Sequence, residues 1–245
     1  MTSNSNSIKS VAIFGSNGSI GSAFIKHFLN QSSIKYIYSF SRAVNNFNHP
    51  KVHHYFLDIS DEKSISDIAD ELPDDLNFDL ILITSGFLHT EVISPEKSVR
   101  FISQQNILDY FNINAIAPLL IAKYFSKFLP KNSPSIFAAL SARVGSIGDN
   151  KLGGWYGYRA SKAALNMFIK TLSIEFSLAL KQSIVIGLHP GTVASNLSKP
   201  FLSNYKKNSV FSPEESVSYL VKVLNSITEN DSGKIFAWNG SEIIA

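Results

Sequence analysis

Short apolar runs alternate along the chain with segments whose apolar residues recur at helical spacing. The first run, residues 11–15, is typical of a buried strand, and the next segment places Ile20, Phe24 and Phe28 on one side of a helix over 20–30. We expect further strands at 36–42, 52–59, 79–86, 135–142, 183–189 and 234–238. Further helices are expected at 61–72, 104–129 (with a break near Pro118), 155–180 and 213–227.

This alternation predicts the fold class and the domain organisation. Strands that alternate with helices indicate βαβ units, and right-handed crossovers then give an α/β fold: a doubly wound parallel sheet of about seven strands with helices on both faces. Residues 8–245 contain no Pro/Gly/Ser-rich linker and no repeat, so we expect a single domain. Residues 1–7 are polar and predict a flexible tail rather than a signal peptide. The irregular segment 192–212 is a candidate lid.

Composition narrows the function classes. The hydrophobic fraction of 44% against 17% charged residues predicts a large buried core, and the net charge of +3 without a basic run longer than Lys206–Lys207 argues against nucleic-acid binding. The absence of cysteine excludes disulfides and thiolate nucleophiles, and the scattered histidines argue against a metal site. No apolar stretch is long enough to span a membrane, so we expect a cytoplasmic protein.

A glycine-rich turn follows the first strand and opens the first helix. Glycines at positions 15, 18 and 21 would form the tight turn, allow close approach of a pyrophosphate and let the helix pack near the sheet. The helix N-terminus would then offer free N–H groups to the phosphates. A plain glycine-rich turn is the alternative. The candidate phosphate-binding residues are Gly15, Ser16, Asn17, Gly18, Ser19, Ile20 and Gly21.

The end of the second strand carries Ser41 and Arg42 and no carboxylate. An acidic residue there would bind the ribose 2′-hydroxyl of NAD, whereas an arginine accommodates the 2′-phosphate of NADP. A guanidinium matches a phosphate bidentately. The sequence therefore favours NADP(H) over NAD(H), the alternative being an ordinary surface arginine.

Tyr158 and Lys162 lie four residues apart near the start of a predicted helix. That spacing places both on one helix face, about 6 Å apart along the axis. A free phenol has a pKa of about 10, and a neighbouring ammonium would bring it closer to neutral pH. The pair could therefore exchange a proton with a carbonyl or alcohol oxygen, although the same spacing also occurs by chance.

In their order along the chain, these motifs resemble the short-chain dehydrogenase/reductase family over essentially the whole length, which implies a Rossmann fold. Ser19 stands where the family commonly has glycine. Asp58 and Ile59 resemble the segment that contacts adenine, while Ser85 and Gly86 lie in Thr84–Gly86, where the family usually has Asn-Ala-Gly. Asn114 resembles the asparagine that supports a water-linked proton relay through the lysine.

The turn after the sixth strand resembles the segment that holds the nicotinamide carboxamide in this family. Its matching residues are Pro190, Gly191, Thr192, Val193 and Ser195. Residues 141–146 and 153–162 are most similar to the C-factor and sniffer-like carbonyl reductases. The resemblance identifies Tyr158, Lys162 and Asn114 as catalytic residues, and we add Ser141 as the candidate for the family's catalytic serine.

One position departs from the family. Its catalytic serine usually lies three residues before a glycine, and the residue three before Gly145 is Ala142. A one-residue shift along a strand turns a side chain to the opposite face, although a bulge could compensate. We therefore favour Ser141 as the substitute, with Ser146 second, and neither reaching the substrate as the third possibility.

These features predict an NADP(H)-dependent oxidoreductase that transfers a hydride between the nicotinamide and a small carbonyl or alcohol. The alternative, suggested by the missing serine and the C-factor resemblance, is a weakly active or inactive NADP(H)-binding sensor; a purely structural homodimer is a third. Trp155, Phe201, Leu202 and Tyr205 are expected on the substrate side, or else in the core or an interface. As in much of the family, helices 104–129 and 155–180 are expected to form a homodimer or homotetramer.

Overall fold

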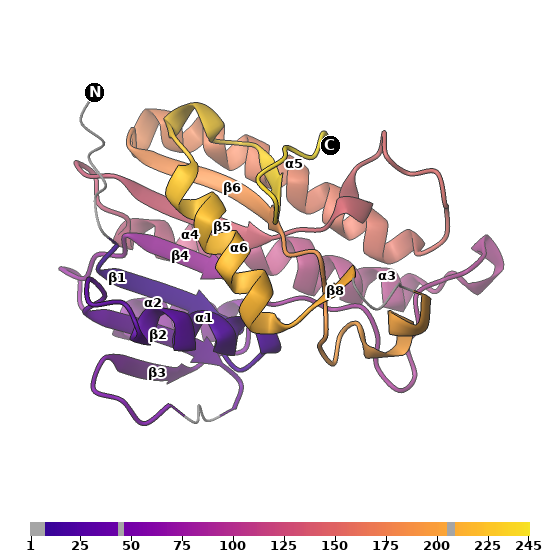
Figure 1. The fold of residues 1–245 in the computed structure, drawn as a ribbon, viewed down its shortest axis with the longest axis horizontal. Helices are drawn as coiled ribbons and strands as arrows, with labels where there is room; N and C mark the ends of the chain where they lie inside the picture. The colour runs from indigo at the N-terminus through magenta and orange to yellow at the C-terminus, as the bar shows by residue number, and fades with distance from the viewer. Residues whose placement is uncertain (1–7, 44–46, 205–208) are drawn as a thin grey trace.

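The computed structural model describes residues 8–43, 47–204 and 209–245. The expected tail at 1–7, Tyr205 and the pair Lys206–Lys207 lie outside these ranges. Strands and helices alternate as the sequence predicts (Figure 1). No helix in the described ranges is long and apolar enough to cross a membrane.

The centre of the molecule is one parallel sheet of seven strands, which confirms the predicted fold class. Their order in the sheet is β3-β2-β1-β4-β5-β6-β9. Because the order reverses between β1 and β4, the carboxyl ends of these two strands form a crevice suited to a ligand. The strands are β1 Ser10–Phe14, β2 Tyr36–Ser41, β3 Val52–Phe56, β4 Leu80–Ile83, β5 Ser135–Leu140, β6 Ser183–His189 and β9 Ile235–Ala237.

Two apolar layers cover the sheet, one on each face. Helices α1 and α6 pack in front of the sheet in the view of Figure 1, and α2, α4 and α5 lie behind it. The second layer includes a group of aromatic rings in which Phe14 stacks on Phe40 at 4.5 Å and meets Phe125 edge-on at 4.8 Å. The helices are α1 Ser19–Leu29, α2 Glu62–Glu71, α3 Gln104–Phe111, α4 Ala117–Phe125, α5 Tyr156–Ala179 and α6 Pro213–Ser226.

The expected helix 104–129 is interrupted, and the interruption begins before Pro118. Helix α3 passes into a π-helical turn, Asn112–Ile116, before α4 begins. Pro118 has no N–H, so the carbonyl of Asn114 cannot accept the usual helical hydrogen bond from residue 118. Within the turn the N–H of Ala117 instead reaches back five residues to the carbonyl of Asn112.

Strand ends and the connecting segments differ from the sequence-based bounds. Strand β5 ends at Leu140, two residues earlier than expected, so Ser141 and Ala142 follow the strand. Segment 192–212 contains two short paired strands, β7 Thr192–Val193 and β8 Val210–Phe211, and the 3-10 helix Lys199–Asn204. Its role as a lid stays a prediction.

The turn between β1 and α1 is packed too closely for a side chain at Gly21. A Cβ there would lie 2.4 Å from the Gly15 carbonyl oxygen and 2.9 Å from the Ser16 Cα, both backbone atoms. We expect Gly21→Ala to lower the free energy of unfolding by about 1–3 kcal/mol, as overpacking does. Urea denaturation measures this. Gly148→Ala, where a Cβ meets nothing within 4 Å, is the matched control, and equal stability of the two variants would contradict the packing argument.

Candidate active site

A cavity of about 1310 Å³ opens at the carboxyl ends of the central strands. It lies where β1 and β4 diverge, the position expected for a ligand in a doubly wound sheet. Ser141 and most of the predicted cofactor residues line it: Gly15, Asn17, Gly18, Ser19, Ile20, Ser41, Arg42, Ile59, Ser85, Gly86, Tyr158, Lys162, Pro190, Gly191, Thr192, Val193 and Ser195. Among the residues assigned to cofactor binding or catalysis, Ser16, Gly21, Asp58 and Asn114 do not line it.

The glycine-rich turn presents the start of α1 to this cavity. The N–H groups of Gly15 and Ser16 donate to the Phe40 carbonyl at 2.9 and 3.2 Å, which fixes the turn against β2. Gly15 has a φ of +79°, a left-handed conformation that glycine adopts readily. No side chain caps α1 and its first turn holds no acidic residue. The helix end can therefore offer its N–H groups and its partial positive charge to an anion.

The next part of the cavity lies at the ends of β2 and β3. Arg42 has a side chain that is 70% exposed, and its Nη1 lies 3.9 Å from the Asp58 carboxylate, a loose ion pair. The Ser41 hydroxyl donates to the Ala43 carbonyl at 2.8 Å. Arg42 is therefore a cation at the cavity with most of its surface free to meet a ligand phosphate.

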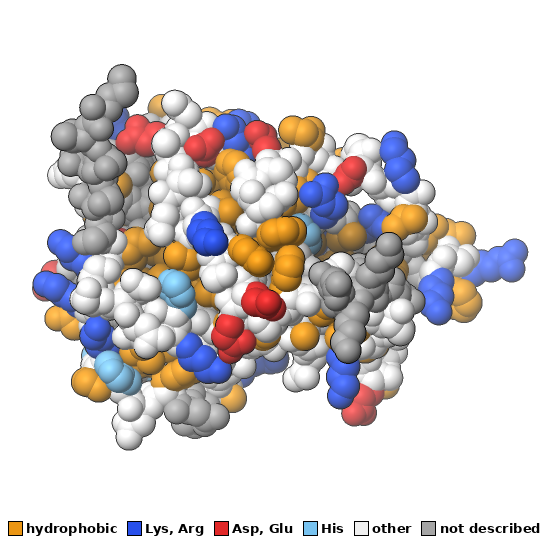
Figure 2. All heavy atoms as spheres, in the orientation of Figure 1, with side chains coloured by type: hydrophobic (Ala, Val, Ile, Leu, Met, Phe, Trp, Pro, Cys, Tyr) orange, Lys and Arg blue, Asp and Glu red, His pale blue; other side chains and the backbone are white. Residues whose placement is uncertain are grey.

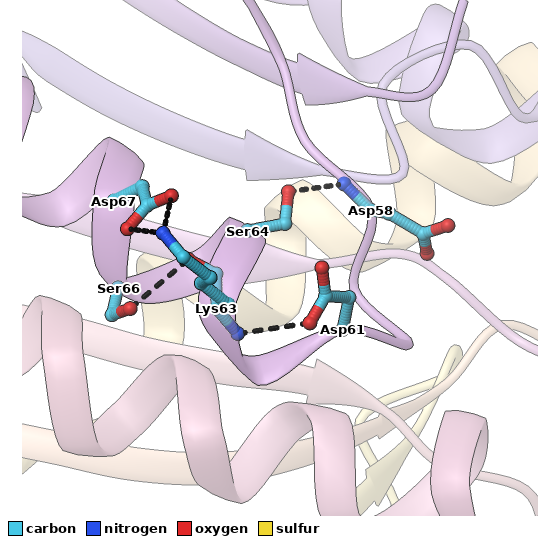
Figure 3. A network of polar contacts seen from close by, with 6 residues as sticks. All are labelled: Asp58, Asp61, Lys63, Ser64, Ser66 and Asp67. Atoms are coloured by element: carbon cyan, nitrogen blue, oxygen red, sulfur yellow. Dashed lines mark hydrogen bonds and ion pairs between the residues drawn. The ribbon is translucent and has the colours of Figure 1, made fainter.

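Asp58 lies between β3 and α2 and joins the network that begins that helix only through its backbone. Figure 3 shows the side chain of Asp61 accepting from the Lys63 N–H, while the Ser64 hydroxyl accepts from the Asp58 N–H. The Asp58 carboxylate points away from this network and accepts two bonds from Ser60. Burial alone would raise the pKa of Asp58, but the Ser60 bonds and the charge of Arg42 outweigh burial and hold the pKa below its usual value.

Tyr158 and Lys162 face the cavity from the first turns of α5. Lys162 is only 3% exposed, and its Nζ donates to the Leu140 carbonyl at 2.8 Å, joining α5 to the end of β5. The same nitrogen lies 6.0 Å from the centre of the Tyr158 ring. Burial lowers the pKa of the Lys162 ammonium to about 8. The predicted pair is thus brought together at the cavity wall, with a cation that is still mostly protonated at neutral pH.

Asn114 lies in the π-helical turn, behind the cavity. Its side-chain oxygen accepts from the Phe87 N–H at 2.8 Å, and its Nδ2 donates to the Phe87 carbonyl and to the Ser161 hydroxyl. These bonds tie α5 to the segment after β4. The Asn114 side chain therefore holds the segments around Lys162 in place. A role of its backbone carbonyl in a proton relay stays a prediction.

The two candidate serines are both buried and both hydrogen-bonded within the protein. The Ser141 hydroxyl donates to Asn166 Oδ1 at 2.6 Å. The Ser146 hydroxyl donates to the Ile244 carbonyl at 2.5 Å, and Ser146 does not line the cavity. A hydroxyl has one proton to donate, so Ser141 must leave Asn166 before it can polarise a substrate. Its catalytic role stays a prediction, and Ala142 occupies the cavity wall beside it.

The turn after β6 closes the opposite side of the cavity. Gly191 has a φ of +77°, and a Cβ there would lie 2.7 Å from the Phe211 ring. The Ser216 hydroxyl donates to the Pro190 carbonyl at 2.8 Å, which anchors the turn to α6. Ser195 and Ser198 share a hydrogen bond at 3.2 Å. The backbone of this turn is therefore held in place where the resemblance expects the nicotinamide.

The wall near Tyr158 is aromatic. Trp155 lies 6.1 Å from the Tyr158 ring and 5.0 Å from the Phe201 ring, as measured between centroids, and both Trp155 and Phe201 line the cavity. This supports two of the four expected substrate-side residues. Leu202 does not line the cavity.

A buried carboxylate that the sequence analysis missed holds the start of α5. Glu96 is 2% exposed; its backbone carbonyl accepts from the Trp155 N–H at 2.6 Å and its Oε2 from the Gly157 N–H at 3.2 Å. Trp155 has a left-handed φ of +54°, which costs about 1–2 kcal/mol for a non-glycine residue. Nothing in the spacing of Glu96 signals this contact, because it lies some sixty residues away along the chain.

Four further cavity residues also escaped the sequence analysis: Arg143, Lys151, Arg159 and His189. His189 ends β6 beside the predicted turn, and burial together with the charge of Arg143 lowers the pKa of His189 to about 4. Arg159 lies within the Tyr158–Lys162 motif, and this position was the one sequence feature that could have placed it at the cavity. Among the described residues, no three His, Asp or Glu side chains gather as a metal site.

Comparison with known proteins agrees with this geometry. The short chain dehydrogenase family matches residues 9–206. An uncharacterised oxidoreductase of Saccharomyces cerevisiae is 32% identical over 204 residues, covering 78% of this chain and 76% of the relative. The C-signal protein of Myxococcus xanthus is 30% identical over 133 residues, covering 54% of this chain and 75% of that protein.

Among solved structures, the NADPH-bound carbonyl reductase from chicken fatty liver superimposes with a TM-score of 0.85. It is 24% identical and covers 97% of this chain and 99% of its own. This similarity confirms the fold, and the match to C-signal agrees with the C-factor-like catalytic motif. With the family match spanning the glycine-rich turn, the Tyr-Lys pair and the Pro-Gly turn, the chain belongs to the short-chain dehydrogenase family of oxidoreductases.

Proposed function

We propose that this oxidoreductase uses NADP(H) to interconvert a small carbonyl compound and its alcohol. The observation that carries the proposal is the pairing of Tyr158 with a buried, cationic Lys162 in the same cavity that begins at the glycine-rich turn. A proton-transfer pair at one end and an anion-binding helix end at the other suit a dinucleotide and a carbonyl substrate.

The glycine-rich turn and the uncapped start of α1 leave room for the pyrophosphate of a dinucleotide. Side chains at Gly15 or Gly21 would collide with neighbouring backbone atoms, so the turn stays bare, and no side chain covers the start of α1. Gly18, Ser19 and Ile20 would hold the pyrophosphate, Arg42 the adenosine ribose phosphate, and the turn from Pro190 to Val193 the nicotinamide. When bound, the nicotinamide supplies or accepts the hydride.

The chain's own residues supply the proton. In reduction, Tyr158 would donate its phenolic proton to the carbonyl oxygen, and in oxidation the phenolate would take it back. The ammonium of Lys162 favours the phenolate, because an opposite charge stabilises the ionised form. With a pKa of about 8, Lys162 keeps most of its charge at pH 7 and loses it as the pH rises above 8. The Asn114 carbonyl would connect this lysine to solvent.

The alanine at position 142 supports a second candidate function, that of an NADP(H)-binding sensor. Without the family's serine, the substrate oxygen lacks one preformed hydrogen-bond donor, and a protein with this defect could bind NADP(H) as a sensor. The relationship to C-signal accords with this alternative. Cofactor binding without turnover of any carbonyl substrate would favour it.

Assembly into a dimer or tetramer also stays a prediction. Helix α5 exposes Met167, Ile174 and Leu178, of which Leu178 is 78% exposed. These apolar side chains lie on one of the two long helical regions that the sequence assigns to an interface.

The central test replaces Tyr158 with phenylalanine, which keeps the aromatic ring and removes the phenolic hydroxyl that would donate the proton. We expect NADPH consumption with a panel of aldehydes and ketones to fall by about 10²-fold or more, since general acid catalysis supplies about that much. Cofactor binding, measured by titration calorimetry, should be unchanged. Full activity of Tyr158→Phe would overturn the assignment of the proton donor.

Restoring the family's serine at position 142 is expected to raise the activity. Ala142 lines the cavity in an extended conformation, so Ala142→Ser places a hydroxyl there while Ser141 keeps its bond to Asn166. We expect kcat to rise by about 10-fold or more, because a donor to the developing oxyanion contributes about 10²–10³. If kcat stays unchanged and Ser141→Ala abolishes activity, Ser141 is the true substitute.

Arg42 is expected to set the cofactor preference. Arg42→Gln removes the cation while keeping a side chain of similar reach, so we expect the KM for NADPH to rise by about 10-fold, the worth of a charge-assisted hydrogen bond. The KM for NADH, which has no 2′-phosphate, should change little. Steady-state kinetics with both cofactors measures the difference, and an equal rise for both would contradict the role.

A further inference from the structure

The cavity that contains Tyr158 combines an aromatic wall with basic side chains. Trp155 and Phe201 form the wall, and Arg143, Lys151 and Arg159 line the same cavity. Leu152, beside Lys151, is 92% exposed although it lines the cavity. Figure 2 shows Lys and Arg side chains spread over the face in view, at its right-hand end as well as on its left.

Two of the three cations have no ionic partner in the described part of the chain. Arg143 pairs with Asp149 at 3.1 Å. Lys151 forms no ion pair with a described residue, and neither does Arg159. Lys151 and Arg159 are therefore the cations of the cavity that no described ion pair engages.

Arg159 is held in a fixed orientation. Its Nε donates to the Gly154 carbonyl at 3.0 Å, within a loop where Gly154 has a φ of +64°. Its two terminal amino groups have no partner among the described residues. A half-buried guanidinium anchored at Nε presents its remaining N–H groups as a fork, which matches the two oxygens of a carboxylate.

The acidic residues of the cavity do not cancel this charge. Asp149 is engaged by Arg143. Asp109 accepts from Gln105 at 2.9 Å and forms no ion pair with Lys151 or Arg159. His89, which also lines the cavity, bonds through Nε2 to the Asn196 carbonyl at 3.0 Å.

From this arrangement we infer that the substrate is an anionic carbonyl compound whose carboxylate is bound by Arg159 and Lys151 and whose apolar body lies against Trp155 and Phe201. This inference rests on the proposed function, because it names the substrate class of the same site. Arg159 directly follows Tyr158 in α5, and both residues line the cavity. The two cations act in binding and orientation, not in proton transfer.

The test compares two aldehydes that differ only in charge, 4-formylbenzoate and its methyl ester, with NADPH as the reductant. We expect kcat/KM for the acid to exceed that for the ester by about 10-fold, the effect of one charge-assisted contact. The advantage should shrink as the salt concentration rises. The double variant Arg159→Gln/Lys151→Gln should remove the preference, because it should lower kcat/KM for the acid by more than kcat/KM for the ester.

The double variant Lys170→Gln/Lys35→Gln is the matched control, since both are exposed lysines away from the cavity and their loss removes two positive charges, as the test variant does. A preference lost equally in this control would show a general charge effect and overturn the site. Equal kcat/KM for acid and ester in the unmodified protein would overturn the inference while leaving the proposed function intact.

A binding measurement separates the two proposals if neither aldehyde is reduced. Titration of the NADP⁺-loaded protein with benzoate and with methyl benzoate, followed by tryptophan fluorescence, reports binding without turnover. Tighter binding of benzoate that is lost in the double variant would support the anion site although the proposed activity had failed. Equal binding of both compounds would overturn the anion site as well.

Discussion

The site depends on one buried ammonium. Lys162 is enclosed between α5 and the end of β5, and its hydrogen bond to the Leu140 carbonyl spans the junction of helix and sheet. Burying a charge is unfavourable, and burial accordingly lowers the pKa of the Lys162 ammonium. The ammonium of Lys162 can stabilise the Tyr158 phenolate only if it stays close to that ring. The surrounding residues must therefore hold Lys162 in its buried position.

Close packing of the segment after β5 provides that enclosure. A Cβ at Gly145 would lie 2.9 Å from the Lys162 backbone carbon and 3.0 Å from Asn166 Nδ2. Asn166 in turn donates to the Gly145 carbonyl at 3.3 Å and accepts from Ser141. Ser141 and Asn166 thus stabilise the packing around Lys162. Because the Ser141 hydroxyl is engaged there, the cavity wall next to it at Ala142 offers no hydroxyl to a substrate. A role in packing and a role in polarising the substrate compete for the same hydroxyl.

At the other end of α5, Glu96 fixes where the helix begins. The contacts that position Tyr158 therefore come from two sides: Glu96 before the helix and the β5 junction behind it. The strained backbone at Trp155 lies between them and brings an indole ring to the cavity. Unfavourable backbone geometry that persists at such a position is typical of functional sites.

The sequence by itself determined the fold class, the strand and helix order, the glycine-rich turn and the Tyr158–Lys162 pair. Each of these is local: apolar periodicity, glycine at a turn or a four-residue spacing on one helix is visible over a short window. Element ends were less accurate, because the ends of β5 and the π-helical turn before Pro118 depend on neighbouring strands and helices. Tertiary structure alone decided that Ser141 bonds Asn166, that Glu96 supports α5 and that Arg159 and Lys151 share the cavity with Trp155 and Phe201. These contacts join residues far apart in the chain, and no spacing rule in one sequence reports which distant side chains will meet.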